Sequence, residues 1–425
     1  MPADRLPVAH ADSVVSSARP ATHFPELESL RGIAILLVFF FHADGVLTPP
    51  HGGIVEPLWL AFLRAGHVGV DLFFILSGFL LGRPFLAAAA SGRMPSLRRY
   101  AQRRTLRILP LYWVAVLVAT LLVARNWEDL RHGIPYLFFL NSFAGGAQPM
   151  FPFSIPWWSL ATEVQFYVVL PLLPLLLMSR RGRIIGVGLL AAYAVAFVGL
   201  DRGWWRMQSI DGYVLLHASV FGCGPLFLLG ISAAALHLHY GEAIRARLAS
   251  IPWMRAGGAD ALLVATWVGI AYVLQWAAFL GFPEAERASN HFYHTVAGIL
   301  LTAVLLALLL APLRLKALWS NRLLGTVGVL SYSLYLVHVP ILSAALKPPN
   351  GAASSGWTPA HMAAVIGLLL LCLGISAITY RLIERPFLSQ KQRLGSADGD
   401  ATPLPATRDA QTAQPGAPGP RRSLN

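Results

Sequence analysis

Long apolar segments separated by short polar loops run through most of this chain. Ten of these segments hold about 17 to 25 mostly apolar residues, which is long enough to cross a bilayer as helices. They cover residues 29–48, 66–86, 105–124, 157–178, 184–200, 213–238, 260–280, 292–311, 326–345 and 362–383. The fifth segment is short, and glycines and a proline interrupt the sixth. The pattern predicts an all-α polytopic membrane protein with about ten transmembrane helices.

The charges in the loops predict an orientation. If the amino terminus is cytoplasmic, the loops assigned to the inside hold sixteen Lys or Arg, and the loops assigned to the outside hold seven. Loops rich in Lys and Arg stay in the cytoplasm. We therefore expect a multi-pass protein of the plasma (inner) membrane with both termini cytoplasmic.

Two polar tails flank the apolar region. Residues 1–26 contain no apolar core of a signal peptide and are predicted to be a cytoplasmic tail. Residues 389–425 are rich in Pro, Ala, Gly and Thr, which predicts a disordered cytoplasmic tail. Residues 27–388 are then the transmembrane domain.

Composition narrows the function classes. Hydrophobic residues make up 56% of the 425 positions and charged residues 12%, so a soluble globular protein is excluded. The net charge of +13 is dispersed among loops, which argues against a nucleic-acid partner and fits a protein embedded in a lipid bilayer. Cys223 and Cys372 both lie in apolar segments, so we expect no disulfide framework, no metal site and no permanently bound cofactor.

Two ionisable residues mark the first apolar segment. Arg31 and His42 are eleven positions apart, which is about 16 Å along a helix, and eleven steps of about 100° return to nearly the same face. An ionisable residue inside a membrane span usually faces the protein interior or a watery cavity, and it indicates a functional site. The alternative for His42 is a neutral imidazole bonded to a neighbouring helix.

A basic cluster lies at the predicted inner mouth of the third segment. Arg103, Arg104 and Arg107 in the sequence RRTLR gather along one side of a helix. Arginine offers planar, bidentate and permanently charged donors, which suit phosphate groups. The alternative is anchoring of the span at the cytoplasmic surface, aided by lipid headgroups.

Two carboxylates lie inside predicted spans and need a partner, a proton or water. Asp71 lies near the outer end of the second segment, and His67, four residues earlier, is a candidate partner. Glu163 lies in the fourth segment, with Tyr167 on the same helical face. Because Glu163 and His42 are expected at similar depth, they could form a base with its orienting partner.

Two further residues complete the set of candidates. His338 is a second intramembrane histidine, in the outer half of the ninth segment. Glu384 ends the last segment on the inner side between Arg381 and Arg385, where it could brace the inner basic cluster.

The motifs occur together in one known family. In order, they are LESLRGIAILLVFFFH, VGVDLFFILSGF, RRxxR, WSLATEVQFYVVLP, SYSLYLVH and ERPF. Over about residues 26–388 the chain resembles the membrane acyltransferase-3 family in their order and spacing. The resemblance implies a multispan O-acyltransferase that moves an acyl group, commonly acetyl from cytoplasmic acetyl-CoA, to a hydroxyl group. Acceptors in the family include envelope glycans and macrolide sugars, so we expect a carbohydrate or glycosylated acceptor.

The resemblance also implies roles for individual residues. It places the essential arginine and histidine of the family on Arg31 and His42, and the donor-binding arginines on Arg104 and Arg107. The acidic residue of the WSL motif falls on Glu163, and the late-span histidine falls on His338. Some relatives carry an extracytoplasmic SGNH-type domain, for which we expect no room in a polar tail of about forty residues.

These inferences combine into an expected mechanism. The CoA phosphates dock on Arg104 and Arg107, with Arg103 and Arg31 as further contacts, and the pantetheine arm extends toward His42. His42 acts as general base on the acceptor hydroxyl, a role that typically contributes about 10²- to 10⁴-fold.

Several roles stay open at this point. His42 could instead be a nucleophile that forms an acyl-imidazole. Glu163 either orients the imidazole or holds the sugar. Asp71, Tyr167, His338 and Glu384 are expected to support the site or the acceptor.

Two other classes of protein compete with the enzyme. A proton-coupled transporter would use His42, Asp71, Glu163 and His338 as a proton relay. That hypothesis leaves the RRTLR cluster unexplained, and the sequence shows no internal repeat of the kind that many transporters have. A scaffolding subunit of an envelope-polysaccharide complex is the third possibility.

Overall fold

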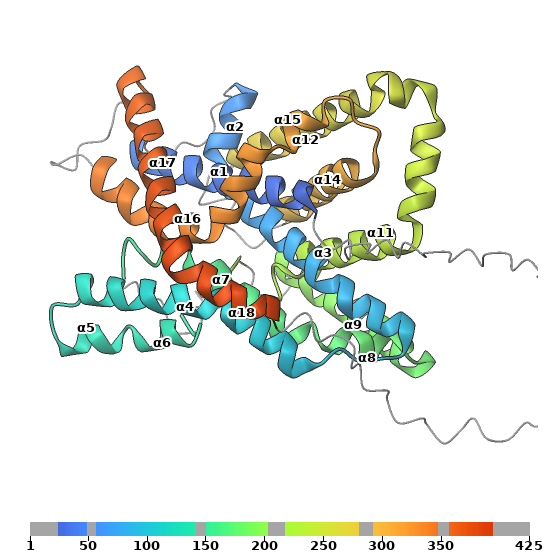
Figure 1. The fold of residues 1–425 in the computed structure, drawn as a ribbon, viewed down its shortest axis with the longest axis horizontal. Coiled ribbons are helices and arrows are strands. Elements are labelled where there is room, and N and C mark those ends of the chain that lie inside the picture. Colours follow the sequence, from blue (N-terminus) through green and yellow to red (C-terminus); the bar gives the residue numbers. More distant parts are fainter. Residues whose placement is uncertain are drawn as a thin grey trace, which may run out of the picture.

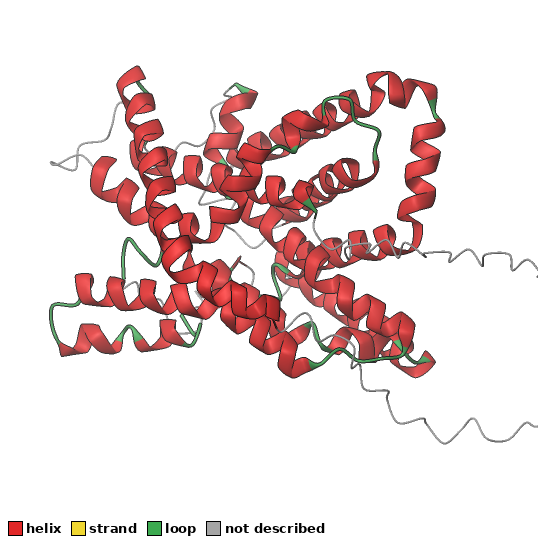
Figure 2. Cartoon of the chain, in the orientation of Figure 1, coloured by secondary structure: helices red, strands yellow, loops and turns green. Residues whose placement is uncertain are grey.

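The computed structural model describes residues 24–48, 57–141, 150–202, 217–279, 292–346 and 357–393, and every regular element in them is helical (Figure 1, Figure 2). The long helices are α1 (Pro25–Leu47), α3 (Val68–Ser91), α4 (Leu97–Val123), α9 (Arg180–Asp201), α11 (Gly224–Ser250), α12 (Ala259–Phe279), α14 (Phe292–Leu310), α16 (Arg322–Leu346) and α17 (Pro359–Thr379). The shorter elements are α2 (Leu58–Arg64), α5 (Trp127–Arg131), α6 (Ile134–Leu137), η1 (Ile155–Trp157), α7 (Trp158–Val169), α8 (Leu172–Leu177), η2 (Met254–Gly258), α15 (Lys316–Trp319), η4 (Tyr380–Glu384) and α18 (Arg385–Arg393).

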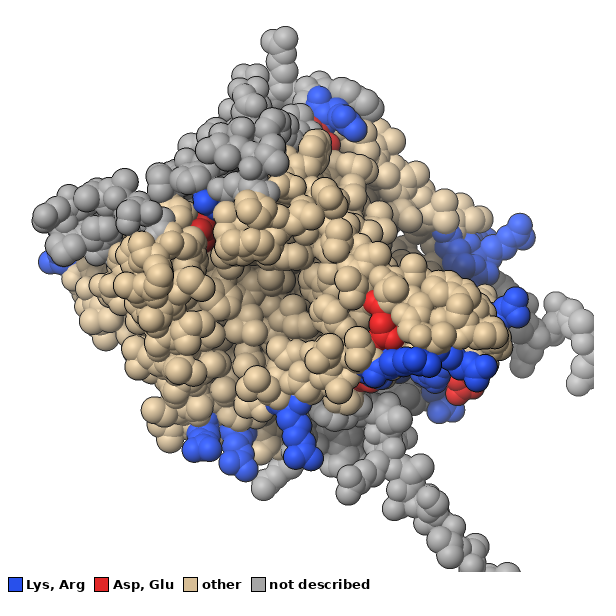
Figure 3. Space-filling view, turned by 90° about the horizontal axis from the view of Figure 1, so that it is seen from above, with Lys and Arg blue, Asp and Glu red and all other residues tan. Residues whose placement is uncertain are grey.

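The helices are long and apolar enough for a polytopic membrane protein. In the described part of the chain, nine helical segments could each span a bilayer. Large apolar side chains of α4, including Trp113, Leu117 and Leu121, are exposed on the outside of the bundle, where lipid would cover them. In the face shown in Figure 3, most charged side chains lie at the edges, and a broad uncharged surface lies between them. The all-α membrane fold predicted from the sequence is therefore confirmed.

The sixth predicted span differs most from the structure. We predicted it over residues 213–238, but α11 begins at Gly224 and continues to Ser250. Its first predicted residues, 213–216, lie outside the described part of the chain. The polar carboxyl-terminal half, with Glu242, Arg245 and Arg247, makes α11 less apolar than the nine candidate spans.

The direction of two neighbouring helices bears on whether α11 crosses the membrane. α1 and α16 run parallel, because Glu28 lies against Gly328, Arg31 against Ser331 and His42 against His338. Parallel transmembrane helices are separated by an odd number of crossings. Six of the candidate spans lie between α1 and α16 in the chain. A crossing by α11 makes this number odd, so the described helices fit the ten spans that the sequence predicts.

Other helix ends differ from the prediction for local reasons. The third span was predicted to begin at residue 105, but α4 begins at Leu97, because the Ser96 hydroxyl caps the helix by accepting from the Arg99 backbone N–H at 3.4 Å. The RRTLR sequence therefore lies wholly within α4. The predicted tail boundary at residue 389 falls within α18, which continues to residue 393, and residues 394–425 lie outside the described part of the chain.

Close backbone contacts hold the centre of the bundle together. α1 packs on α16 where a Cβ atom at Gly32 would overlap the carbonyl oxygen of Leu324, and one at Gly328 would overlap that of Glu28. α3 packs on α11 in the same way at Gly78, which lies against the backbone of Phe227. Small residues allow this approach between membrane helices. The two interfaces place α1 and α3 at the core of the fold.

Candidate functional site

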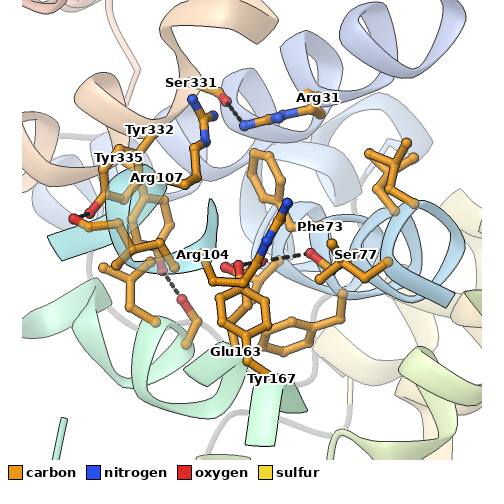
Figure 4. A pocket seen from close by; sticks show the side chains of 18 residues that line it. Arg31, Phe73, Ser77, Arg104, Arg107, Glu163, Tyr167, Ser331, Tyr332 and Tyr335 are labelled. Carbon is orange, nitrogen blue, oxygen red and sulfur yellow. Dashed lines mark hydrogen bonds between the residues drawn. The ribbon is translucent and has the colours of Figure 1, made fainter. Parts of the chain in front are cut away.

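A cavity of about 120 Å³ with both polar and apolar walls opens between α1, α3, α4, α7 and α16 (Figure 4). Its charged and polar lining is formed by Arg31, Ser77, Arg104, Arg107, Ser159, Glu163, Tyr167, Ser331, Tyr332 and Tyr335. Apolar side chains of α3, including Phe73, Phe74 and Leu80, line the rest. The cavity thus brings together residues from five distant parts of the sequence, and it includes two of the three arginines of RRTLR. Arg103 does not line it.

The arginines of the cavity keep hydrogen-bond donors for a ligand. The Arg31 side chain donates from Nη2 to the Ser331 hydroxyl at 3.1 Å. The Arg104 guanidinium lies over the ring of Tyr167, 5.8 Å from its centroid. The Nε atoms of Arg31 and Arg104 are buried and have no hydrogen-bond partner among the described residues. Buried guanidinium donors without a partner are costly, so an anionic ligand would satisfy them.

Arg107 connects the cavity to the end of the last span. Its Nη1 lies 3.3 Å from Glu384 Oε2, and Ser333 donates to the other oxygen of Glu384. The Arg107 guanidinium also lies 5.7 Å from the ring centroid of Tyr332. Glu384 is 3% exposed, so this is a buried ion pair that joins α4, α16 and η4. Glu384 therefore contacts the RRTLR cluster through one of its arginines, Arg107.

Glu163 is held within the cavity by two hydroxyl groups. Ser77 donates to its Oε1 at 2.7 Å, and Tyr167 donates to the same oxygen at 2.8 Å. The contact from Tyr167 confirms that the two residues share a helical face. The described contacts do not pair Glu163 with His42: Glu163 bonds to Ser77 and Tyr167, and His42 bonds to another residue.

His42 bonds to His338, and the contacts fix the tautomer of both rings. His338 Nδ1 lies 3.0 Å from the Leu334 carbonyl oxygen, and His42 Nδ1 lies 2.9 Å from that of Val38. A carbonyl can only accept, so both Nδ1 atoms carry the proton. His338 Nε2 lies 3.2 Å from His42 Nδ1, so it also accepts a hydrogen bond from the His42 Nδ1–H. None of the described residues bonds to His42 Nε2, so its lone pair is available.

One side chain that lines the cavity separates the cavity from the pair of His42 and His338. Tyr335 lines the cavity, and its ring centroid lies 5.8 Å from that of His338. The Tyr335 hydroxyl donates to the Pro156 carbonyl at 2.6 Å, which fixes this ring between the two sites. His42 does not itself line the cavity, yet Arg31 and His42 both face α16, as the shared helical face predicts.

Asp71 has a different partner from the one predicted. Its Oδ2 lies 2.7 Å from Nδ1 of His294 on α14, whereas His67 bonds through Nε2 to the Tyr293 hydroxyl at 2.7 Å. His67 was expected to be that partner; it lies just before the first residue of α3, where its side chain makes no capping hydrogen bond, and its Nε2 bonds to α14. Sequence reasoning missed His294, although a histidine at the start of the eighth apolar segment was a visible signal.

No metal site is apparent in the described ranges. They contain no group of three or more His, Cys, Asp or Glu side chains placed to hold a metal ion.

Comparison with known proteins identifies the family. Residues 24–381 match the acyltransferase-3 family, described as an acyltransferase domain. Over 391 residues the chain is 26% identical to a protein of Komagataeibacter xylinus named as membrane-bound transacylase BcsY, which covers 88% of this chain and 85% of that protein. No solved structure matches the chain.

Two longer relatives are named as O-acetyltransferases. The chain is 23% identical over 354 residues to the peptidoglycan O-acetyltransferase OatA of Listeria monocytogenes. It is 26% identical over 385 residues to a protein of Staphylococcus aureus named as an O-acetyltransferase. The matches cover 76% and 86% of this chain but only 50% and 57% of those two proteins. With the family match across most of its length, this chain belongs to the acyltransferase-3 family and is a membrane-bound acyltransferase.

Proposed function

We propose that this protein transfers an acyl group, acetyl in the simplest case, from cytoplasmic acyl-CoA to a hydroxyl of a carbohydrate acceptor. The O-acetyltransferase names of two relatives support this reaction, and the word peptidoglycan in one of them supports a glycan acceptor. The observation that carries the proposal is the hydrogen-bonded pair of His42 and His338, which leaves His42 Nε2 free to act as a general base.

The arginine-lined cavity supports the choice of donor. Acyl-CoA carries several phosphate groups, which suit the guanidinium groups of Arg31, Arg104 and Arg107. From Arg31, the pantetheine arm would follow α1 for about 16 Å to bring its thioester to His42. Tyr335, between the cavity and His338, lies on this route.

The chemical step then needs only groups that the site and substrates supply. The acceptor oxygen attacks the thioester carbonyl while His42 Nε2 takes the hydroxyl proton. The C–O ester bond forms and the C–S bond breaks. The CoA sulfur leaves with the bond electrons and takes the proton back from His42, which returns to its starting tautomer. His338 Nε2 accepts from His42 Nδ1–H throughout and supports the positive charge that develops on the ring.

A transfer assay tests the proposal. Membranes that contain the protein are incubated with acetyl-labelled acetyl-CoA and the envelope glycan of the host, and label is counted in the glycan. We expect transfer by the native protein, a loss of about 10²-fold or more in His42→Ala, and full transfer in His239→Ala, which changes an exposed histidine of α11. Retained transfer in well-expressed His42→Ala would rule out the general base. If the native protein transfers nothing with several donors and acceptors, the proton-coupled transporter becomes the better hypothesis.

A further inference from the structure

Glu163 is a carboxylate in the cavity that the arginines line. Ser77 and Tyr167 both donate to its Oε1, and none of the described residues bonds to its Oε2. None of the described ion pairs includes Glu163 either, although it lines the same cavity as Arg31 and Arg104. One oxygen of this carboxylate is therefore available to a ligand in the cavity.

Phosphate binding alone does not explain a carboxylate at this place. Like charges repel, so a carboxylate close to a phosphate group weakens the binding of that phosphate. A counter-ion for the arginines is no better explanation, because hydroxyl groups and not guanidinium groups hold Glu163. A carboxylate oxygen accepts hydrogen bonds from N–H and O–H groups. Glu163 therefore suits a neutral part of the ligand that carries such donors.

The ring of Tyr167 connects Glu163 to one of the arginines. The Arg104 guanidinium lies over this ring, 5.8 Å from its centroid, and the hydroxyl of the same ring donates to Glu163 at 2.8 Å (Figure 4). Arg104 and Glu163 thus contact the same side chain. A ligand whose phosphate binds to Arg104 then places the groups next to that phosphate close to Glu163.

One face of α3 forms an apolar wall of the cavity around this position. The apolar side chains of α3 that line the cavity are those of Val70, Phe73, Phe74, Leu76, Leu80 and Leu81. From Val70 to Leu81 they extend about 16 Å along the helix. Ser77 is the polar residue of α3 in this lining, and it is the residue that bonds to Glu163. The wall thus has a hydrogen-bonding position between apolar stretches.

The pantetheine arm of acyl-CoA has a matching order of groups. It begins at the diphosphate with a branched unit that carries methyl groups and a hydroxyl, and it continues with amide and methylene groups. We infer that Glu163 Oε2 binds the pantetheine arm, accepting from the hydroxyl or the amide N–H nearest the diphosphate, while the methyl and methylene groups lie on α3. The inference rests on the proposed function and gives Glu163 a part in donor recognition. Glu163 then neither orients His42 nor holds the sugar.

Donors with and without phosphate groups separate the roles of Glu163 and Arg104. S-acetylpantetheine has the arm and the thioester of acetyl-CoA but no phosphate. In Glu163→Gln the amide oxygen can still accept from Ser77 and Tyr167, whereas an NH₂ group, which only donates, replaces Oε2. Glu242→Gln is the matched control, because it makes the same change at an exposed position of α11. Initial rates are measured with each donor varied at saturating host envelope glycan, and with glycan varied at saturating acetyl-CoA.

We expect Glu163→Gln to raise the KM for both donors about tenfold or more, the effect of a lost hydrogen bond to a charged group, and to leave the KM for glycan within about twofold. Arg104→Ala should raise the KM for acetyl-CoA more than the KM for S-acetylpantetheine. Glu242→Gln should change none of these constants. Where S-acetylpantetheine transfers slowly, its inhibition constant against acetyl-CoA replaces its KM.

An unchanged donor KM in Glu163→Gln would overturn the inference, and so would S-acetylpantetheine that neither transfers nor inhibits. A loss confined to acetyl-CoA would place Glu163 against the nucleotide, and a higher KM for glycan alone would place it against the acceptor. Equal losses for donors and glycan, with a lower melting temperature, would show a structural brace instead. The proposed function fails separately, if the native protein shows no His42-dependent transfer from acetyl-CoA.

Discussion

At the scale of single residues, one tautomer decides which nitrogen of His42 meets the substrate. The Val38 carbonyl and His338 Nε2 both accept from His42 Nδ1, so the free lone pair is on Nε2. His338 is completely buried, and its own Nδ1 is held by the Leu334 carbonyl. Hydrogen-bonded imidazoles of this kind are fixed in orientation as well as in proton position. His338 therefore acts on the reaction through His42.

This dependence predicts a partial loss of activity in His338→Phe. Val38 still accepts from His42, so the tautomer survives, but the partner that stabilises the charged ring is gone. We expect kcat to fall about tenfold, the effect of one hydrogen bond of about 1.4 kcal/mol, while the KM for acetyl-CoA changes little. Steady-state rates in detergent provide the measurement. An unchanged kcat would show that His338 only fills space.

The arginines of α4 allow a comparison within one helix. Arg104 lines the cavity and keeps a buried donor without a partner among the described residues, whereas Arg98, six residues earlier, is exposed. Arg104→Ala should raise the KM for acetyl-CoA about tenfold or more, because a charge-assisted bond to phosphate is lost. Arg98→Ala should leave that constant unchanged. Equal effects of the two substitutions would indicate that both arginines only anchor the span.

The sequence predicts contacts along one helix better than contacts between helices. The spacing of 3.6 residues per turn places Glu163 beside Tyr167 and turns Arg31 and His42 to one face, and the structure shows both. The partner of Asp71 is 223 positions away in the chain, so no local spacing could indicate His294. Pairing across the bundle depends on helix packing, which the sequence alone did not reveal.

At the scale of helices, the contact between α1 and α16 sets the geometry of the site. Arg31 and His42 meet Ser331 and His338 only because the two backbones approach closely at Gly32 and Gly328. Apolar segments predicted both spans to within a few residues, since bilayer thickness fixes their length. The close approach depends on two glycines, whose role becomes visible only when the helices are paired.

Gly328→Ala should disturb the site without touching a reacting group. A Cβ atom there would overlap the Glu28 carbonyl oxygen, so the helices must separate, at a typical cost of about 1–3 kcal/mol. We expect a lower melting temperature and a large loss of kcat. Gly325→Ala is the matched control on the same helix, because its Cβ would come no closer than 4.0 Å to Ser29 Oγ. Similar behaviour of the two variants would contradict a geometric role for Gly328.

At the scale of the whole molecule, whether α11 crosses the membrane determines on which side of the membrane the later loops and the chain end lie. α11 runs parallel to α3, since Gly230 lies against Ile75 and His237 bonds to Arg83. Three candidate spans lie between α3 and α11 in the chain. Because this number is odd, a helix that crosses the membrane at the position of α11 runs in the same direction as α3. With α11 across the membrane, both chain ends fall on one side. The loop charges predict that this side is the cytoplasm.

Single-cysteine labelling tests this arrangement. Arg93→Cys lies just after α3, Arg247→Cys lies near the end of α11, and Asn126→Cys lies after α4; all three positions are exposed, while the native Cys223 and Cys372 are buried. An impermeant maleimide added to intact cells should label Asn126→Cys alone, and all three variants after permeabilisation. Arg247 is the decisive position, because it shares a side with Arg93 only if α11 crosses. Labelling of Arg247→Cys in intact cells would place the end of α11 outside, and the even number of spans, with the shared side of the two termini, would be wrong.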